Sequence, residues 1–338
     1  MQQVRIHGPA DVRLDEVEAP CPGPRDAVVR IAACGVCGSD LKYIELGGLA
    51  GPGPAPMPLG HEAAGIVEWV GAEVSDLTVG QRVVIHPGDD QLGRIGNGGA
   101  EGALAPRLLV REAARGGRLF DVPEGLPLDV AAFAEPLAVG MHAVEQADVV
   151  AGDKVVVFGC GSIGLAAVAT LLDRGARDVI AVDLSQRRRE LALELGVRAA
   201  LDPATDDIWA QLAALHGTVP SMFGPMPAAC AYIEASGASA LIGQIIDHAA
   251  PHARLAVVAL HYAPIPTSFL MILIKQLTIR GAMEYPARFE DALDLLSRRD
   301  ISPIITHRFP LERFNEGLAL LKGSRDCGKV MITLSDDA

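Results

Sequence analysis

The sequence predicts an α/β protein with two domains, one an antiparallel barrel-like β domain and the other a doubly wound parallel sheet. The length of 338 residues corresponds to two domains at roughly 150 residues each. Short β-branched stretches fill the first part of the chain, and strands alternate with helical patterns in the middle. Half of the residues are hydrophobic but only 4% are aromatic, so Val, Leu, Ile and Ala must build the core.

From Val4 to about Leu109 the apolar stretches are short and separated by glycine and proline. Examples are Ala27–Ala32, Ala64–Val70, Arg82–Ile85 and Leu108–Val110. Strands at this spacing, with little helix between them, are typical of an antiparallel barrel. A Pro/Gly-rich loop is expected at Gly47–Pro58.

From about Leu128 the apolar period becomes helical, and strands and helices then alternate. The successive segments are Lys154–Phe158, Ile163–Arg174, Val179–Val182, Arg187–Leu195, Ala229–Ile233, Leu241–His248, Leu255–Val258 and Leu277–Arg280. Such alternation predicts a doubly wound parallel sheet. Thr218–Pro227 is expected as a long loop. Helices at Arg288–Arg298 and Leu311–Leu321 and a strand at Lys329–Thr333 close the chain.

Charge and cysteine content exclude several classes of protein. The formal net charge of −13 repels phosphate backbones and anionic lipids, so neither nucleic acid nor membrane is an expected partner. The six cysteines show no disulfide framework, and the N-terminus has no signal-peptide pattern. Two apolar runs, Val155–Leu172 and Leu255–Ile274, approach the length of a membrane span, but glycines interrupt the first and prolines the second. We expect a cytoplasmic protein.

A G-x-G-x-x-G motif follows the strand that ends at Phe158 and opens the next helix. Gly159 permits the tight turn, Gly161 lets a pyrophosphate approach the backbone, and Gly164 allows close helix–strand packing. Ser162 and Ile163 complete the predicted loop, whose N–H groups face the phosphates at the helix N-terminus. The pattern predicts a dinucleotide site.

The second strand of this unit ends at Asp183. A carboxylate there accepts hydrogen bonds from the ribose hydroxyls of NAD and repels the 2′-phosphate of NADP. Arg187, Arg188 and Arg189 follow, and we choose Arg188 as the residue that flanks the adenosine ribose. A solvated basic helix start is the alternative interpretation of these arginines.

Thiolate, imidazole and carboxylate groups occur at the edges of predicted loops of the first domain. They are Cys37, His61 and Glu62, and Glu135 adds a carboxylate just before the nucleotide domain. Three ligands of mixed S, N and O type, with an open fourth position, are typical of catalytic zinc. Taken singly, each residue also has a purely structural interpretation, as a buried thiol, a satisfied histidine or a helix N-terminal charge.

These motifs carry a family resemblance. Gly35-Val-Cys-Gly-Ser-Asp, Gly60-His-Glu, Glu135-Pro-Leu-Ala-Val-Gly and Gly159-Cys-Gly-Ser-Ile-Gly occur in one order that resembles the zinc-containing medium-chain alcohol dehydrogenases. Ala132-Phe-Ala-Glu-Pro-Leu-Ala-Val and Thr306-His-Arg-Phe-Pro-Leu are similar to the polyol branch of sorbitol, L-idonate and 2,3-butanediol dehydrogenases. The resemblance implies a GroES-like barrel at residues 1–146 and 282–338, with a Rossmann domain at 147–281 inserted between.

The resemblance also implies roles for residues. Cys37 and His61 would be zinc ligands, joined by either Glu62 or Glu135, with Glu62 also counted as catalytic. Ser39 would carry the proton of the alcohol, and Asp40 would contact the ligands from outside.

The chain departs from the family pattern in three places. Ile85–Ala105 contains no cysteine, where relatives with a second metal carry four, so we expect one catalytic zinc and no structural zinc. Lys42 replaces the histidine that often ends the proton relay. Glu284 replaces an arginine near the substrate. Tyr43 is a further candidate for the substrate pocket, with a core aromatic as the alternative.

We therefore expect an NAD-dependent zinc enzyme that transfers hydride between NAD and a secondary alcohol or ketone, the alcohol being a polyol, a diol or a cyclic alcohol. One alternative is a zinc-free, NADPH-dependent enone or quinone reductase of the same superfamily. Another is a non-catalytic, nucleotide-binding structural protein. The apolar stretches Phe269–Ile274 and Leu277–Arg280 further predict a homodimer or homotetramer.

Overall fold

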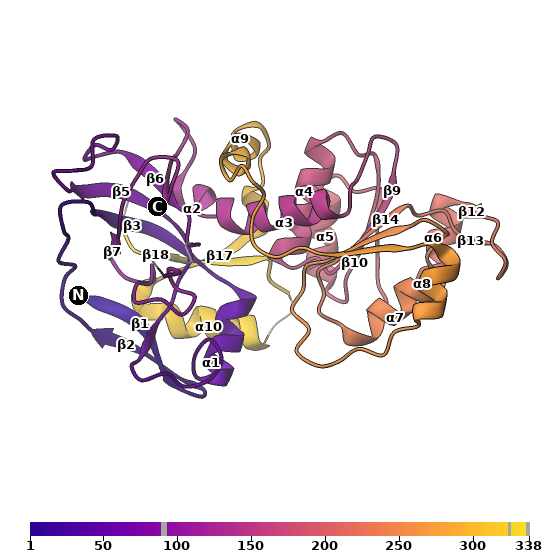
Figure 1. Ribbon diagram of the computed structural model, residues 1–338, viewed down its shortest axis with the longest axis horizontal. Helices are drawn as coiled ribbons and strands as arrows, with labels where there is room; N and C mark the ends of the chain where they lie inside the picture. The colour runs from indigo at the N-terminus through magenta and orange to yellow at the C-terminus, as the bar shows by residue number, and fades with distance from the viewer. Residues whose placement is uncertain (89–92, 324–325, 336–338) are drawn as a thin grey trace. The chain divides into compact units, whose positions relative to one another are not determined.

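A computed structural model describes residues 1–88, 93–323 and 326–335, and the chain forms two compact units (Figure 1). The first unit consists of Met1–Glu135 and Phe289–Ala338, and the second is the continuous segment Pro136–Arg288. The predicted combination of an antiparallel β unit with a doubly wound parallel sheet is confirmed.

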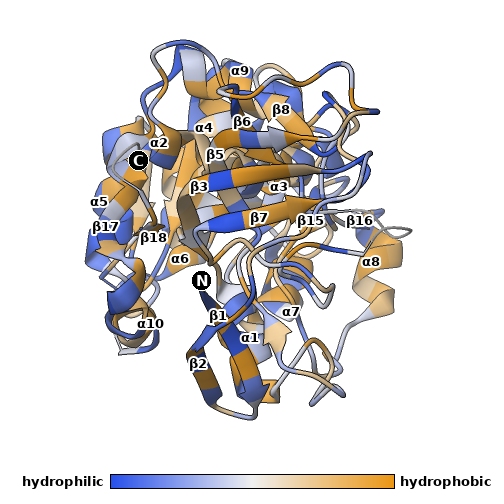
Figure 2. Cartoon of the chain, turned by 90° about the vertical axis from the view of Figure 1, so that its left-hand side faces the viewer, coloured by the Kyte–Doolittle hydropathy of each residue, from blue (hydrophilic) through white to orange (hydrophobic). Residues whose placement is uncertain are grey.

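The first unit is built on a seven-stranded sheet in the order β17-β18-β3-β5-β6-β8, with β7 paired to β3. Its strands are β3 (Ala27–Val36), β5 (Glu62–Val70), β6 (Arg82–Ile85), β7 (Arg107–Val110), β8 (Leu119–Asp121), β17 (Ile305–Pro310) and β18 (Lys329–Thr333). Strand β3 is almost wholly buried, and Figure 2 shows it largely in the hydrophobic colour. A continuous apolar run is what burial of both faces of a strand requires. Because β18 pairs with β3, the end of the chain completes the sheet begun near its start.

A smaller sheet and several helices complete this unit. They are β1 (Gln2–Gly8), β2 (Asp11–Glu16), β4 (Met57–Pro58), α1 (Gly38–Leu46), α2 (Leu128–Ala131), α9 (Glu290–Arg298), α10 (Phe314–Gly323) and the short 3-10 helices η1 (Ser302–Ile304) and η2 (Leu311–Arg313). The core between these elements is almost entirely aliphatic, as the composition predicts.

The second unit is a six-stranded parallel sheet in the order β11-β10-β9-β14-β15-β16. Its strands are β9 (Lys154–Phe158), β10 (Asp178–Val182), β11 (Ala199–Leu201), β14 (Ala231–Glu234), β15 (Arg254–Val257) and β16 (Thr278–Gly281), and its helices are α3 (Ala134–Gln146), α4 (Ser162–Asp173), α5 (Gln186–Leu195), α6 (Ile208–His216), α7 (Ser239–His248) and α8 (Phe269–Lys275). The strand order reverses between β9 and β14. In open α/β sheets, ligands bind outside the carboxyl ends of the strands at such a reversal.

The bounds of the two units do not coincide with the predicted domain boundaries. The first boundary lies at Glu135 rather than after Gln146, so α3 falls almost entirely in the second unit. Gly140 of α3 lies against α4 so closely that a Cβ there would be 2.6 Å from Ala166 Cβ. The second boundary lies at Arg288 rather than at Gly281.

Several elements differ from the sequence-based expectations or were not among them. Thr218–Pro227, expected as a loop, contains the hairpin of β12 (Thr218–Val219) and β13 (Met226–Pro227). The apolar stretch Phe269–Ile274, for which no element was predicted, lies in α8, whose N-cap Ser268 accepts a hydrogen bond from Met271 N–H. Helix α1 directly after β3 was not expected at all. No helix in the described ranges is long and apolar enough to cross a bilayer.

Candidate functional site

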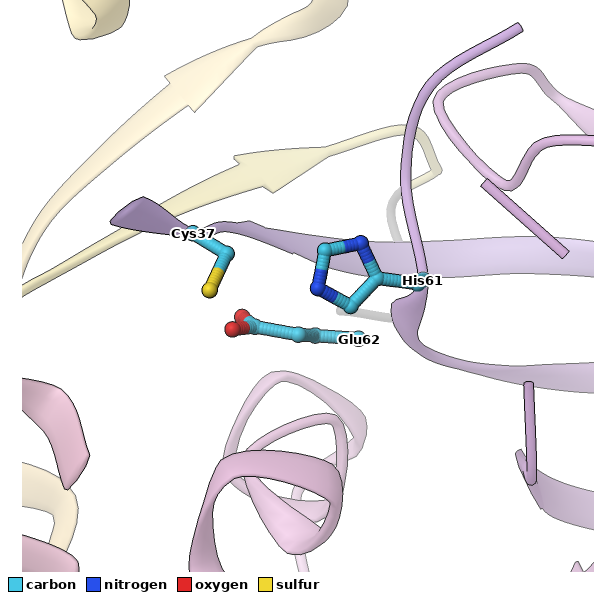
Figure 3. Close-up of side chains that lie close together, drawn as sticks. All are labelled: Cys37, His61 and Glu62. Atoms are coloured by element: carbon cyan, nitrogen blue, oxygen red, sulfur yellow. The ribbon is translucent and has the colours of Figure 1, made fainter. Parts of the chain in front are cut away.

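Three potential metal ligands meet where β3 ends and β5 begins. Gly35 of β3 lies opposite Glu62, the first residue of β5, in their antiparallel ladder. Cys37 follows β3 and His61 precedes β5, so this pairing brings both residues beside Glu62. One ligand atom of each lies within 4.8 Å of the other two, and Figure 3 shows the three side chains converging. His61 and Glu62 are buried, and Cys37 is half-buried.

Asp40 contacts two of these ligand residues. The backbone N–H of Cys37, the N-cap residue of α1, donates to Asp40 Oδ2 at 2.8 Å. Asp40 Oδ1 lies 3.5 Å from His61 Nδ1. A carboxylate at Nδ1 orients the imidazole and leaves Nε2 for a metal.

The electrostatics of this group favour a cation. Burial lowers the pKa of His61, but the carboxylate of Asp40 and the thiol of Cys37 outweigh burial, so its pKa lies well above the usual value. The same holds for Lys329 of β18. Burial lowers its pKa, but the neighbouring Glu62, Cys37 and Glu135 outweigh burial and raise the pKa above its ordinary range. The raised pKa values of both basic groups indicate a strongly negative electrostatic potential around these side chains.

Lys329 is a buried partner of the site that sequence reasoning missed. Its side chain is 1% exposed and its ammonium forms an ion pair with Glu62 Oε2, whose residue is 0% exposed. Gly35 makes room for this pair, because a Cβ there would overlap the Glu62 carboxylate and lie 2.6 Å from Lys329 Cε. A single lysine in a C-terminal strand carries no motif, so only the β18–β3 pairing reveals it.

The residues present fit a metal ion. Glu62 Oε1 has no partner among the described residues, whereas Glu62 Oε2 pairs with Lys329 Nζ and His61 Nδ1 faces Asp40. Buried polar atoms are nearly always bonded, so this cluster is incomplete as a purely protein structure. Thiolate, imidazole and carboxylate together are a zinc ligand set.

The fourth candidate ligand lies apart from these three. Glu135, in the first turn of α3, is buried but is not part of the group within 4.8 Å. It nevertheless contributes to the negative potential at Lys329. The geometry therefore favours Glu62 over Glu135 as third ligand.

The candidate proton carriers lie on α1. The hydroxyl of Ser39 lies near enough to Tyr43 to lower the pKa of its phenol, although burial, the larger effect, raises that pKa. Lys42, one residue earlier, forms a 3.0 Å ion pair with Glu45. Tyr43 rather than Lys42 is thus the residue in contact with Ser39.

Each of the three glycines of the dinucleotide motif is required for a different steric reason. At Gly159, with φ of 89°, a Cβ would lie 2.7 Å from the backbone of Ser236. At Gly164 a Cβ would overlap the carbonyl oxygen of Gly159. At Gly161, the N-cap of α4 and the residue before Ser162 and Ile163, a Cβ would meet only Arg188 Nη1, at 3.9 Å, so side chains leave this position open.

Asp183 is fixed beside this loop. Its Oδ2 accepts a hydrogen bond from Cys160 N–H at 2.6 Å and its Oδ1 accepts one from Ser185 N–H at 2.7 Å. Of the arginines that follow, Arg187 pairs with Glu190 and Glu194, and Arg189 pairs with Asp202. Arg188 is the one whose guanidinium lies near Gly161.

Glu284 is exposed and has a positive φ of 68° in the loop after β16. A non-glycine residue in the left-handed region is uncommon. Its predicted role at the substrate stays a prediction.

Comparisons with known proteins give matches over nearly the whole chain. A family model described as alcohol dehydrogenase GroES-like domain matches residues 23–116, and one described as zinc-binding dehydrogenase matches residues 162–298. A sorbitol dehydrogenase of Pongo abelii is 32% identical over 94% of this chain and 91% of the relative. An (R,R)-butanediol dehydrogenase of Bacillus subtilis (strain 168) is 31% identical over 98% of this chain and 99% of the relative. The crystal structure of 2R,3R-butanediol dehydrogenase from Bacillus subtilis superimposes with a TM-score of 0.86 at 28% identity, covering 99% of both chains.

The space at Gly35 yields a test of the ligand group. Gly35→Ala should displace Glu62 and lower the affinity for zinc by about 10- to 100-fold, the range found when the surroundings of metal ligands are altered. Gly38→Ala is the matched control, because no atom lies within 4 Å of a Cβ at that position. Competition with a chromogenic chelator measures both affinities. Equal affinities in the two variants would contradict the placement of Glu62 in the metal site.

Proposed function

This chain belongs to the zinc-containing medium-chain alcohol dehydrogenases, in their polyol branch, and we propose that it oxidises a secondary alcohol of the polyol, diol or cyclic type with NAD and one catalytic zinc ion. It is an NAD(P)-dependent oxidoreductase of small alcohols, as its relatives are. The observation that carries the proposal is the buried group of Cys37, His61 and Glu62.

Cys37, His61 and Glu62 would hold the zinc, with a fourth position open to substrate. Zinc in such a site supplies Lewis acidity, which lowers the pKa of an alcohol hydroxyl. Lys329 would hold one oxygen of Glu62 while the other faces the metal. We expect a single zinc per chain, because Ile85–Ala105 has no cysteine to hold a second, although residues 89–92 of that stretch lie outside the described ranges.

The same group argues against the two alternatives. A zinc-free enone or quinone reductase binds no metal, so its chemistry does not require a thiol, an imidazole and a carboxylate grouped within 4.8 Å of one another. In a non-catalytic nucleotide-binding protein, unpartnered buried polar groups would only destabilise the fold.

Asp183 supports NAD rather than NADP as the coenzyme. Its carboxylate is held at the end of β10 by the N–H groups of Cys160 and Ser185. A fixed negative charge at this place accepts ribose hydroxyls and repels a 2′-phosphate. Arg188 beside Gly161 is the group that would oppose this preference.

A steady-state screen tests the function directly. Zinc-loaded protein should reduce NAD with at least one polyol, diol or cyclic alcohol. Its kcat/KM with NAD should exceed that with NADP by more than about tenfold, because hydrogen bonds to a charged group contribute about 1.5–3 kcal/mol each. Comparable efficiencies with both coenzymes would show that Arg188 outweighs Asp183. Activity only on enones or quinones with NADPH would support the zinc-free alternative.

The proton of the alcohol needs a carrier, and α1 provides one. Ser39 lies two residues after Cys37, and its hydroxyl is close to the phenol of Tyr43. We propose that the Ser39 hydroxyl accepts the proton while it donates its own to the hydroxyl of Tyr43, which in turn releases its phenolic proton to solvent. Lys42 stays the alternative outer end of this relay, although its ammonium is paired with Glu45.

Substitutions on α1 separate these roles. Ser39→Ala should lower kcat by about 10²- to 10⁴-fold, the usual contribution of a positioned acid–base group, while zinc content and NADH affinity stay unchanged. Tyr43→Phe should lower kcat less and change its pH dependence, and Lys42→Ala should do neither. A Ser39→Ala enzyme with normal turnover, when an isotope effect shows that hydride transfer limits the rate, would remove Ser39 from the mechanism.

We also propose a homodimer or a homotetramer. Strand β16 is the outer strand of its sheet, and all four of its residues are exposed. Beside it in sequence, α8 exposes Phe269, Leu270 and Leu273. Exposed apolar surface next to an unpaired strand edge is typical of an interface. Light scattering at micromolar concentration should give at least twice the chain mass, and a monomer would contradict this proposal.

The six cysteines are free, and a cytoplasmic location stays a prediction.

A further inference from the structure

The carboxyl ends of β14 and β15 carry a buried acid–histidine pair that the mechanism above does not use. Glu234, the last residue of β14, is fully buried, and its Oε2 lies 2.9 Å from His261 Nε2. His261 comes from the loop after β15, and its side chain is 8% exposed. The pair thus joins two loops that both follow the carboxyl ends of strands in the parallel sheet.

The second oxygen of Glu234 organises the turn that follows β14. Oε1 accepts hydrogen bonds from Ser236 N–H at 2.8 Å, Ser236 Oγ–H at 2.6 Å and Gly237 N–H at 2.9 Å. This turn also lies against the loop after β15, because a Cβ at Gly237 would be 3.9 Å from Leu260 O. One carboxylate therefore ties together residues 235–238 and residues 258–261.

These loops lie at the coenzyme site. The backbone of Ser236 packs against Gly159 of the dinucleotide motif. Strands β9 and β14 are the neighbours between which the strand order reverses. The dinucleotide binds in the crevice at this reversal, and β9 with β10 forms the half that receives the adenosine. The loops after β14 and β15 therefore belong to the half that receives the nicotinamide nucleotide.

Packing alone does not explain a histidine at position 261. With Nε2 facing Glu234, Nδ1 is left buried with no hydrogen-bond partner in the part of the chain that the structure describes. An unsatisfied buried nitrogen destabilises a folded chain, and an apolar side chain would avoid it.

We propose that the contact between His261 and Glu234 is a latch that holds the loops at residues 235–238 and 258–261 in the conformation that receives the nicotinamide half of the coenzyme. His261 is thus a positioning residue for the coenzyme. The inference rests on the coenzyme use of the proposed function and is independent of the metal ligands and of the alcohol.

Binding of NADH to the zinc-loaded enzyme without alcohol tests the latch, with fluorescence as the readout. His261→Leu should raise the Kd for NADH by about tenfold to a hundredfold, the factor that corresponds to one lost hydrogen bond to a charged group. His261→Gln, whose amide N–H can still donate to Glu234, should restore the Kd to near that of wild type. If His261→Leu does not fold, His261→Asn replaces it, because its amide is one bond too short for the contact.

His248→Leu is the matched control. His248 is the last residue of α7 and stacks on Trp209. Because α7 runs antiparallel to the strands, His248 lies near their amino ends, away from the loops after β14 and β15. Its Kd for NADH should equal that of wild type. The latch is overturned if His261→Leu binds NADH like wild type, or if His261→Gln binds as weakly as His261→Leu. A wild-type enzyme that binds no NADH would instead contradict the proposed function itself.

Discussion

The proposed metal site depends on one constraint, the strand register that sets Gly35 opposite Glu62 with Lys329 beside them. A carboxylate that is 0% exposed needs a cation, and Lys329 of β18 supplies one from the other side of β3. Breaking a buried pair by removing one partner costs about 3–5 kcal/mol, so this contact ties β5, β3 and β18 together. The same register places Cys37 and His61 within reach of Glu62. The first unit therefore needs both ends of the chain to build its ligand group.

The second unit depends on backbone sterics rather than on charge. The Cβ atoms that Gly159 and Gly164 lack would overlap the turn after β14 and the loop itself. Asp183 then fixes the loop by accepting a hydrogen bond from Cys160 N–H, so the carboxylate that we propose selects NAD also shapes the loop of the dinucleotide motif. Glu234 has the corresponding role on the other side of β9, where its carboxylate accepts hydrogen bonds from the N–H groups of the turn after β14.

The sequence predicts features that depend on local chemistry and misses those that depend on distant pairing. The glycine motif, Asp183 and the candidate ligands Cys37, His61 and Glu62 lie in short segments whose residue types are enough to suggest a dinucleotide site and a metal site. Helix α1 was missed because its N-cap is a cysteine, which is not a preferred capping residue, and because its sequence has little apolar periodicity. Lys329 was missed because its partner lies on a strand far away in the chain. The choice between Glu62 and Glu135 stayed open for the same reason, since no local pattern ranks two distant carboxylates.

Anomalous X-ray scattering at the zinc absorption edge, from crystals of the zinc-loaded protein, tests the central claim most directly. The claim is that the β3–β5 register builds one catalytic zinc site from Cys37, His61 and Glu62. The account predicts a single strong peak per chain, in contact with the side chains of these three residues. A peak held by Glu135 in place of Glu62, a second peak within residues 85–105, or no peak in an enzyme that is fully active would contradict it.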